Sequence, residues 1–377
     1  MAQRLLTPAF VALTLAELAY FIAVGIMIPV VPLFTAGSLN AGPVGVGVAV
    51  GAFSLTALAL RPIAGRMSDR LGSGRLFLYG GILFTIVAAA HLFVANYRAL
   101  LVLRVLLGIA EAMFFVAGMA ALADIAPPDR LGEALSYNSL GLYLGIAIGP
   151  ALGEWLLDVG SFRAAWIGAA CLGLAASVLA VKVPSPQRIA DTASVPLLPG
   201  QLIAPGLAFL AGLSGAAGFL GFAALHAREV GLGGAGPVLF VYGIVVIGCR
   251  LLFAKLSDRY QPARLSAVAL ALCGAGLVVM SAWRMPAGLI AGATVLAVGI
   301  TFLTPAFFRI MMSRLPTGHR GAAAATFSIF VDLGLGGGPV VVGLIARWSS
   351  IATAFAVMAG LALIAATLTL ANARRSR

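Results

Sequence analysis

Charged residues and cysteines are scarce in this 377-residue sequence. Only 10% of the residues are charged while 62% are hydrophobic, and soluble domains carry about 25% charged residues. The composition therefore excludes an ordinary soluble domain. The sequence also has no Walker loop, no Rossmann glycine fingerprint and no serine triad on a soluble element, so neither ATP-driven transport nor enzymatic activity is expected. The three cysteines lack disulfide or metal spacing, and we expect no metal and no cofactor.

Long apolar stretches fill most of the chain. A bilayer span takes about 20 apolar residues, which leaves room for about twelve helices and no further domain. The predicted spans are 8–34, 43–67, 73–94, 98–125, 131–157, 162–182, 202–228, 236–257, 263–283, 286–313, 320–346 and 350–372. The fold class is therefore an all-α membrane protein.

The chain contains a tandem repeat. Arg66, Ser68, Asp69 and Arg70 recur as Lys255, Ser257, Asp258 and Arg259, and the two aspartates lie 189 residues apart (258 − 69 = 189). A Gly-x3-Gly-Pro segment repeats at the same offset. The only long polar, proline-rich segment lies between the copies. We therefore predict a six-helix bundle over 1–182, a cytoplasmic linker over 183–200 and a second six-helix bundle over 201–377, which is a transporter architecture.

The basic residues predict the orientation. The net charge is +12, but the charges are spread over loops of one side, which argues against nucleic acid as a partner. With the N-terminus inside, 15 of the 24 Lys and Arg residues lie on the inner side, five lie on the outer side and four remain within spans. Both termini are therefore expected in the cytoplasm. Only two basic residues are lysines, and this arginine bias suggests a GC-rich bacterial genome. The expected location is the cytoplasmic (inner) membrane of a bacterium, with several spans.

Four motifs then resemble the major facilitator superfamily, and specifically the twelve-helix branch of drug:proton antiporters. They are the loop from Gly65 to Arg75, Arg104-x-x-x-Gly108, the segment Gly145-x3-Gly149-Pro150-x-x-Gly153, and Pro29-x-x-Pro32. In that superfamily the loop usually ends with adjacent basic residues, whereas here Gly74 precedes a single Arg75. The resemblance implies two pseudo-symmetric bundles that transport a small molecule by alternating access.

The two loops of the repeat are predicted to close a cytoplasmic gate. A carboxylate at Asp69 or Asp258 can accept hydrogen bonds from a helix N-terminus, where the macrodipole favours its charge. Arg70 can pair with Asp124 at the inner end of the fourth span. The superfamily resemblance implies that such contacts latch the gate, and ordinary topogenic loop charges are the alternative. The gate residues would be Gly65, Asp69, Arg70, Arg75, Asp124, Asp258 and Arg259.

Three carboxylates lie near the middle of predicted spans, namely Glu17, Glu111 and Asp332. Because an unpaired charge in the bilayer is costly, such residues usually face a cavity and carry function. A buried carboxyl can exchange protons near neutral pH, which is the chemistry of a proton-coupled transporter. Glu111 is the first candidate and Glu17 the second, and Asp332 could bind substrate or anchor its helix. Arg104 would tune a neighbouring carboxyl, and structural ion pairs are the alternative.

Small residues recur every fourth position in the fifth span, so they share one helix face and allow a neighbouring helix to approach closely. A proline in each copy permits a kink. We predict a pivot at Gly145, Gly149, Pro150, Gly153, Gly338 and Pro339. Candidate substrate-cavity residues are Tyr20, Phe21, Phe114, Phe115, Asn138, Tyr143 and Phe307. Lipid-facing or packing roles are the alternative for the aromatic residues, and His91 and His226 are minor candidates for titration.

The sequence thus predicts a monomeric secondary transporter, with proton-coupled efflux of a drug, sugar or metabolite as the preferred function. Its partners would be a small-molecule substrate, protons and the lipid bilayer. Uptake or a uniporter without proton coupling is one alternative. A membrane sensor or scaffold that does not transport is the alternative of another class.

Overall fold

The computed structural model describes residues 6–127, 130–185, 199–253, 260–314 and 320–375. Within these ranges all regular secondary structure is helical. Contacts between Cα atoms divide the chain into two units. Unit 1 comprises Met1–Phe34 and Ala52–Thr192, and unit 2 comprises Thr35–Gly51 and Ala193–Arg377. Helix α2 contributes residues to both units.

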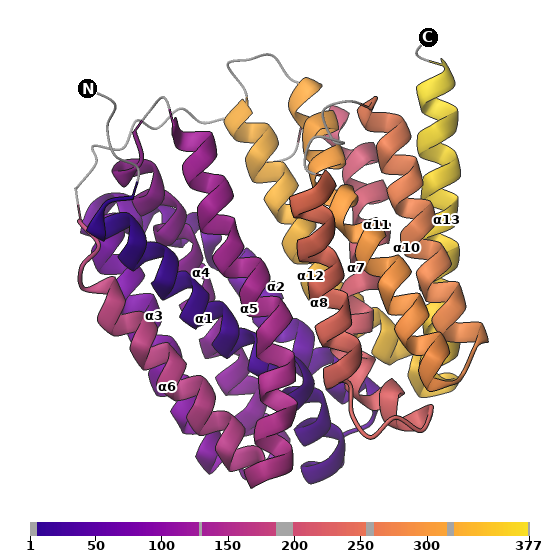
Figure 1. Ribbon diagram of the computed structural model, residues 1–377, viewed down its shortest axis with the longest axis horizontal. Coiled ribbons are helices and arrows are strands. Elements are labelled where there is room, and N and C mark those ends of the chain that lie inside the picture. The colour runs from indigo at the N-terminus through magenta and orange to yellow at the C-terminus, as the bar shows by residue number, and fades with distance from the viewer. Residues whose placement is uncertain (1–5, 128–129, 186–198, 254–259, 315–319, 376–377) are drawn as a thin grey trace. The chain divides into compact units, whose positions relative to one another are not determined.

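The helices of unit 1 are drawn from indigo to magenta in Figure 1. They are α1 (Pro8–Leu33), α2 (Pro43–Leu71, from Ala52 onward), α3 (Ser73–Ala90), α4 (Tyr97–Ile125), α5 (Leu131–Gly160) and α6 (Phe162–Ala180). Within this unit α1 packs on α5 and α6, and α3 packs on α4 and α6.

Unit 2 repeats the same packing. Its helices are α7 (Gly200–Glu229), α8 (Gly236–Phe253), α10 (Pro262–Ala282), α11 (Pro286–Ser313), α12 (Arg320–Trp348) and α13 (Ile351–Arg375). Helix α7 packs on α12 and α13, and α10 packs on α11 and α13. The pairings correspond one for one to those of α1 and α3 in unit 1. The tandem repeat in the sequence is therefore also a repeat of helix packing.

Helix ends follow from local chemistry. Thr7 caps α1, since its hydroxyl accepts a hydrogen bond from the Phe10 N–H at 3.2 Å and Pro8 occupies the first helical position. Asn96 caps α4 in the same way, accepting from the Ala99 N–H at 2.9 Å. The prolines of the repeated motif do not end their helices, because α5 continues past Pro150 and α12 past Pro339.

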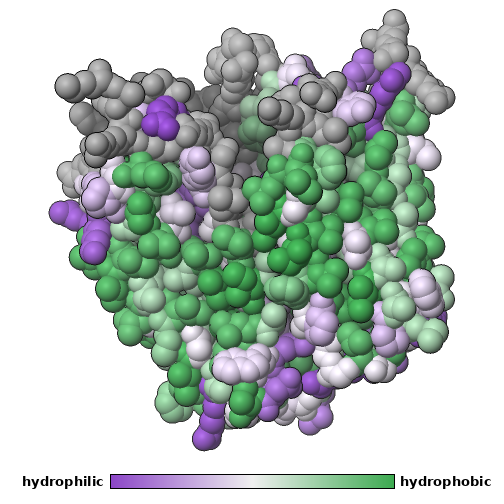
Figure 2. Space-filling model, viewed as in Figure 1, coloured by the Kyte–Doolittle hydropathy of each residue, from purple (hydrophilic) through white to green (hydrophobic). Residues whose placement is uncertain are grey.

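Among the residues that the structure describes, eleven helical stretches are long and apolar enough to cross a membrane. On the face shown in Figure 2, apolar side chains cover the helices of each unit along most of their length, and hydrophilic side chains gather toward the helix ends. The predicted all-helical membrane fold is confirmed, and most helix boundaries agree with the predicted spans within a few residues.

Candidate functional site

A cluster of polar side chains lies buried inside unit 1, within its membrane-spanning helices. Glu17 of α1 is only 6% exposed. Its Oε2 accepts a hydrogen bond of 2.7 Å from Nδ2 of Asn138 in α5. The amide oxygen of Asn138 in turn accepts a hydrogen bond of 3.2 Å from the Thr14 hydroxyl, one helical turn before Glu17. The carboxylate is therefore held in place by a short chain of polar groups between α1 and α5.

Glu111 of α4 is the second carboxylate of this cluster. It is half-buried and lies close enough to Glu17 for the two carboxyls to interact electrostatically. Tyr20, one turn after Glu17, is fully buried and interacts electrostatically with both Glu111 and Arg104. The structure thus brings Glu17, Glu111 and Arg104 together around Tyr20, although the sequence placed them on two different helices.

Arg104 is itself 6% exposed and is packed among apolar groups. Its Nη1 lies 4.0 Å from the sulfur of Met27, and its guanidinium carbon lies 5.0 Å from the centre of the Phe53 ring. A guanidinium over an aromatic face gains favourable cation–π energy. Because arginine keeps its proton in proteins, Arg104 supplies a fixed positive charge to this cluster.

The third intramembrane carboxylate belongs to the other unit. Asp332 lies in α12, within unit 2, and is 2% exposed. The structure therefore assembles two of the three predicted carboxylates into one cluster and places the third in a separate unit.

Glycine makes room for the Glu17 carboxylate. A Cβ at Gly118 of α4 would lie 2.8 Å from Glu17 Oε1, closer than ordinary contacts allow. Neither Gly118 nor Thr14 was singled out from the sequence. Asn138 was proposed for a substrate cavity, yet it precedes Gly141 by one helical turn and so continues the glycine face of α5 toward α1. That spacing was the available signal for its contact with Glu17.

Removal of the Asn138 amide is expected to destabilise the protein through Glu17. Asn138→Leu leaves a buried carboxyl without its 2.7 Å hydrogen bond, which costs about 1–3 kcal/mol. In a Glu17→Leu background the same change is expected to cost much less, because no carboxyl is left to satisfy. Thermal unfolding of the four proteins of this double-mutant cycle in detergent measures the coupling. Equal effects of Asn138→Leu in the two backgrounds would contradict the contact.

The predicted cavity aromatics pack together within their own units. Tyr20 stacks on Phe114 with ring centres 3.9 Å apart. Phe77 also stacks on Phe114, with ring centres 4.0 Å apart. Phe21 makes an edge contact with Phe115 at 6.5 Å, and the Arg61 guanidinium lies 4.8 Å from the Phe115 ring centre.

The other two cavity candidates lie elsewhere. In unit 2, Phe307 is 1% exposed and contacts Phe209. The side chain of Tyr143 lies outside the described residues.

The predicted gate loop of unit 1 is mostly helical. Gly65, Asp69 and Arg70 lie in the last turns of α2, and Arg75 lies in the first turn of α3, which is separated from α2 by one residue. Asp124 at the end of α4 accepts a hydrogen bond of 2.9 Å from the hydroxyl of Ser73, the first residue of α3. Asp69 is partly buried, and Arg70 and Arg75 are exposed. The pairing of Arg70 with Asp124 stays a prediction. Asp258 and Arg259, from the second copy of the loop, lie outside the described residues.

The start of the predicted linker docks on the N-terminus of α3. The Arg75 N–H donates to Ser185 Oγ at 2.7 Å, so this hydroxyl satisfies one of the free donors of the first helical turn. A Cβ at Gly74 would collide with the carbonyl oxygens of Val183 and Pro184. Gly74, the position where the loop departs from the superfamily pattern, thus lets the linker approach α3.

A methyl group at Gly74 is therefore expected to displace the linker and destabilise the protein. Gly65 is the matched control, since it lies near the end of α2 and a Cβ added there would have nothing within 4 Å. Gly65→Ala is expected to be neutral or slightly stabilising, because alanine favours helix by up to about 1 kcal/mol. The midpoint of thermal unfolding should fall for Gly74→Ala alone. Equal midpoints for the two variants would show that Val183 and Pro184 do not hold this position.

The predicted pivot residues allow helices to pack backbone against backbone. In unit 1, a Cβ at Gly145 would lie 2.5 Å from Phe21 Cβ, and one at Gly149 would lie 2.6 Å from Gly25 Cα. A Cβ at Gly153 would meet the Ile26 carbonyl at 2.6 Å. In unit 2, Gly338 packs in the same way on Ser214 of α7. The glycine face predicted from the spacing is thus the contact of α5 with α1 and of α12 with α7.

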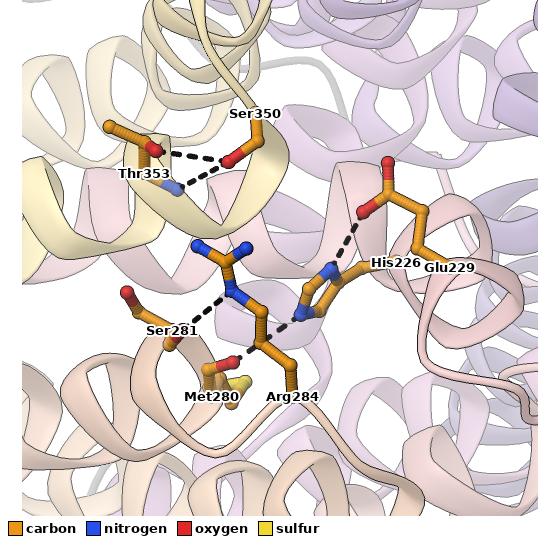
Figure 3. Close-up of polar contacts among 7 residues, drawn as sticks. All are labelled: His226, Glu229, Met280, Ser281, Arg284, Ser350 and Thr353. Atoms are coloured by element: carbon orange, nitrogen blue, oxygen red, sulfur yellow. Dashed lines mark hydrogen bonds and ion pairs between the residues drawn. The ribbon is translucent and has the colours of Figure 1, made fainter.

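A smaller polar group in unit 2 surrounds His226, near the end of α7. Its Nδ1 lies 3.0 Å from a carboxylate oxygen of Glu229, and its Nε2 lies 3.4 Å from the Met280 carbonyl. Figure 3 shows the imidazole between these two groups, with Arg284 beside them donating to the Ser281 carbonyl. His226 therefore ties α7 to the end of α10. In unit 1, His91 bonds through Nδ1 to the Val87 carbonyl at 2.7 Å.

Membrane-spanning helices in two units of matching internal packing, with carboxylates and an arginine buried within the spans, define a helical membrane transporter. The family model of the Major Facilitator Superfamily matches residues 13–339 and, in an overlapping match, residues 238–377. The chain belongs to the Major Facilitator Superfamily. It is accordingly a multi-pass secondary transporter of a small molecule and not an enzyme.

Its relatives and structural neighbours agree with this assignment. An uncharacterized MFS-type transporter of Salmonella typhimurium is 27% identical over 358 residues, which are 92% of each chain. The uncharacterized MFS-type transporter YhhS of Escherichia coli is 24% identical over 372 residues, 95% of this chain and 91% of YhhS.

Among solved structures, the peptide transporter POT in complex with alafosfalin has a TM-score of 0.83 at 14% identity, covering 97% of this chain and 94% of its own. The nucleoside transporter NupG has a TM-score of 0.78 at 15% identity, covering 96% and 99%. At such identities these neighbours show the fold alone, and they confirm it.

Proposed function

We propose that this protein is a proton-coupled exporter of a small organic compound in the cytoplasmic membrane of a bacterium, with both termini in the cytoplasm. The observation that carries the proposal is the buried cluster of Glu17, Glu111, Tyr20 and Arg104 inside unit 1. The orientation rests on the excess of Lys and Arg on one side of the predicted spans.

The cluster has the chemistry of a proton carrier. Two carboxylates within electrostatic reach repel each other when both are charged, and a proton on either one removes this repulsion. Burial among apolar side chains makes each extra charge costly. One proton therefore changes the energy of the cluster more than it would at an exposed surface, and the conformational preference of the transporter can follow its protonation.

Arg104 and Tyr20 complete this proposed site. The guanidinium supplies a constant positive charge, while Tyr20 interacts electrostatically with both this charge and Glu111. When the carboxyls are ionised, Arg104 offsets part of their charge. After protonation the balance shifts toward a net positive cluster. Substrate and proton would in this way favour different states, which is what antiport requires.

The remaining motifs support movement and direction. The close backbone contacts of α5 with α1 and of α12 with α7 have no bulky side chains between them and would serve as pivots. The Gly145-to-Gly153 segment resembles the motif of drug:proton antiporters, and this resemblance favours export over uptake. The loops around Asp69 and Asp258 would latch the cytoplasmic gate, and the transporter would act as a monomer by alternating access.

Liposomes test the proposal. The purified protein is reconstituted with a pH-sensitive dye inside acidic vesicles, and candidate compounds are added outside in turn. Antiport predicts that a transported compound makes the lumen more alkaline, because each entering molecule drives protons out. Equilibration of a labelled compound without a change in lumenal pH would contradict coupling and identify a uniporter. Lumenal acidification or absence of any flux would instead indicate uptake by symport or a protein that does not transport.

A further inference from the structure

Unit 2 contains a cavity away from its intramembrane carboxylate. It has a volume of about 670 Å³ and lies along α7 and α13, with Phe307 of α11 and Val341 of α12 in its lining. The volume is within the range of roughly 300–1,000 Å³ that is typical of small-molecule sites. Apolar side chains form most of its walls, among them Leu207, Ala211, Phe307, Leu361, Ile364 and Leu368.

The cavity is open along its side. Leu207 is 55% exposed, Ile364 is 58% exposed and Leu368 is 59% exposed, so large apolar side chains of both walls are accessible. Both walls belong to helices of membrane-spanning length and hydropathy. An apolar cavity that opens along such helices suits a hydrocarbon chain.

One end of the cavity is polar and carries a positive charge. Arg314, the residue after α11, lies in its lining together with Thr369 and Asn372 of α13. The guanidinium is anchored there, since Nη1 donates to the Gln201 carbonyl at 3.1 Å. Arginine has five N–H donors in a planar fork that suits phosphate oxygens, so this anchored group has further donors to offer a ligand.

The length of the cavity fits one leaflet. Along α13 the lining runs from Met358 to Asn372, which is 14 residues (372 − 358 = 14), or about 21 Å at the rise of an α-helix. Half of the hydrocarbon core is about 15 Å thick, and the interfacial region adds several ångströms. An acyl chain lying in the cavity would therefore place its phosphate near Arg314.

We propose that this cavity binds a phospholipid with an anionic headgroup, with an acyl chain between α7 and α13 and the phosphate on Arg314. A basic group at the membrane boundary attracts anionic lipid. A choline headgroup offers the same phosphate but adds a positive charge beside the arginine, so it binds more weakly. This proposal rests on membrane embedding alone and does not depend on proton coupling or direction of transport.

Native mass spectrometry of the detergent-purified protein, titrated with phosphatidylglycerol or phosphatidylcholine, tests the site. One phosphatidylglycerol is expected to bind in preference to phosphatidylcholine. Arg314→Gln should weaken phosphatidylglycerol binding about fivefold, since one basic residue near a membrane surface contributes about 1 kcal/mol. The matched control is Arg284→Gln, which also removes an exposed arginine with one backbone hydrogen bond but lies outside the cavity.

A second pair of variants tests the apolar walls. Ala211→Phe would place a ring in the cavity. We expect it to weaken phosphatidylglycerol binding at least tenfold more than Arg314→Gln does. Ala356→Phe places the same ring on an exposed position of α13 outside the lining and should leave binding unchanged. Thermal unfolding verifies that each variant is folded.

For the wild-type protein, phosphatidylglycerol with a photoreactive acyl chain gives an independent measurement. Cross-links are expected on α7 and α13 within the cavity. The proposal would be overturned by cross-links spread evenly over the exposed helices. Equal binding of the two lipids would also overturn it, and so would wild-type binding in both the Arg314→Gln variant and the Ala211→Phe variant.

Discussion

Glu17→Gln is expected to abolish proton-driven accumulation of substrate while leaving exchange of substrate across the membrane intact. A pH difference of one unit corresponds to about 1.4 kcal/mol per proton, so a one-proton antiporter concentrates its substrate about tenfold. When the carboxyl that carries the proton is lost, the accumulation ratio should fall to unity, a tenfold loss. Glu111→Gln tests the other half of the carboxyl pair in the same assay of radiolabelled substrate in liposomes.

The pH dependence of exchange tells which of the two carboxyls carries the proton. If protonation displaces substrate, wild-type counterflow falls as the pH is lowered. The variant at the proton carrier is expected to lose this dependence, because its amide has no proton to gain. Glu229→Gln is the control, since this carboxylate is 51% exposed and pairs with His226 in unit 2. Retention of wild-type accumulation and pH dependence by both Glu17→Gln and Glu111→Gln would make these carboxylates structural.

Substitution of two neighbouring glycines of α12 by alanine is expected to change the stability of the protein differently. A Cβ at Gly338 would lie 2.9 Å from Ser214 Cα and collide with the Ser214 carbonyl, whereas nothing lies within 4 Å of a Cβ at Gly337. Overpacking typically costs about 1–3 kcal/mol, so Gly338→Ala should be clearly destabilised. Gly337→Ala should be neutral or more stable, because alanine favours helix by up to about 1 kcal/mol over glycine.

Thermal unfolding of the two purified variants in the same detergent measures this difference. The comparison is direct because both residues lie in one helix and both variants add one methyl group. Transport assays extend it, since a pivot that needs the contact of α12 with α7 should also slow in Gly338→Ala. Equal unfolding midpoints for Gly337→Ala and Gly338→Ala would contradict the close packing at Gly338.

The sequence was sufficient to predict the helices and to predict which face of α5 packs against a neighbouring helix. Apolar runs determine spans directly, and a glycine every fourth residue places Gly145 and Gly149 on one side of a helix. The partner of that face could not be read from spacing, because it depends on tertiary packing. The structure identifies it as α1, with Gly25 opposite Gly149.

The candidate site shows more clearly that contacts between distant residues cannot be predicted from a single sequence. Glu17 and Glu111 were each singled out because a charge within a span is costly, yet they lie 94 residues apart (111 − 17 = 94). No local pattern could show that they lie close to one another and to the same tyrosine. Asn138 was assigned to a substrate cavity from its polarity alone, whereas its amide bonds to Glu17. A hydrogen bond between helices depends on side-chain geometry that a single sequence does not contain.

The predicted gate loop contains one position, Gly74, whose role became clear only in the structure. Gly74 departs from the superfamily pattern, and from the sequence this was only a difference. In the structure it is the position where the carbonyls of Val183 and Pro184 approach α3. A departure from a motif can therefore mark a contact particular to one chain.

The measurement that tests proton coupling most directly is the substrate gradient at which net flux stops. In liposomes with a fixed pH difference, labelled substrate is supplied at a series of inside-to-outside ratios and its net movement is followed. A proton antiporter predicts that the ratio of zero flux shifts about tenfold for each pH unit and each proton exchanged. Zero flux at equal concentrations for every pH difference would contradict proton coupling.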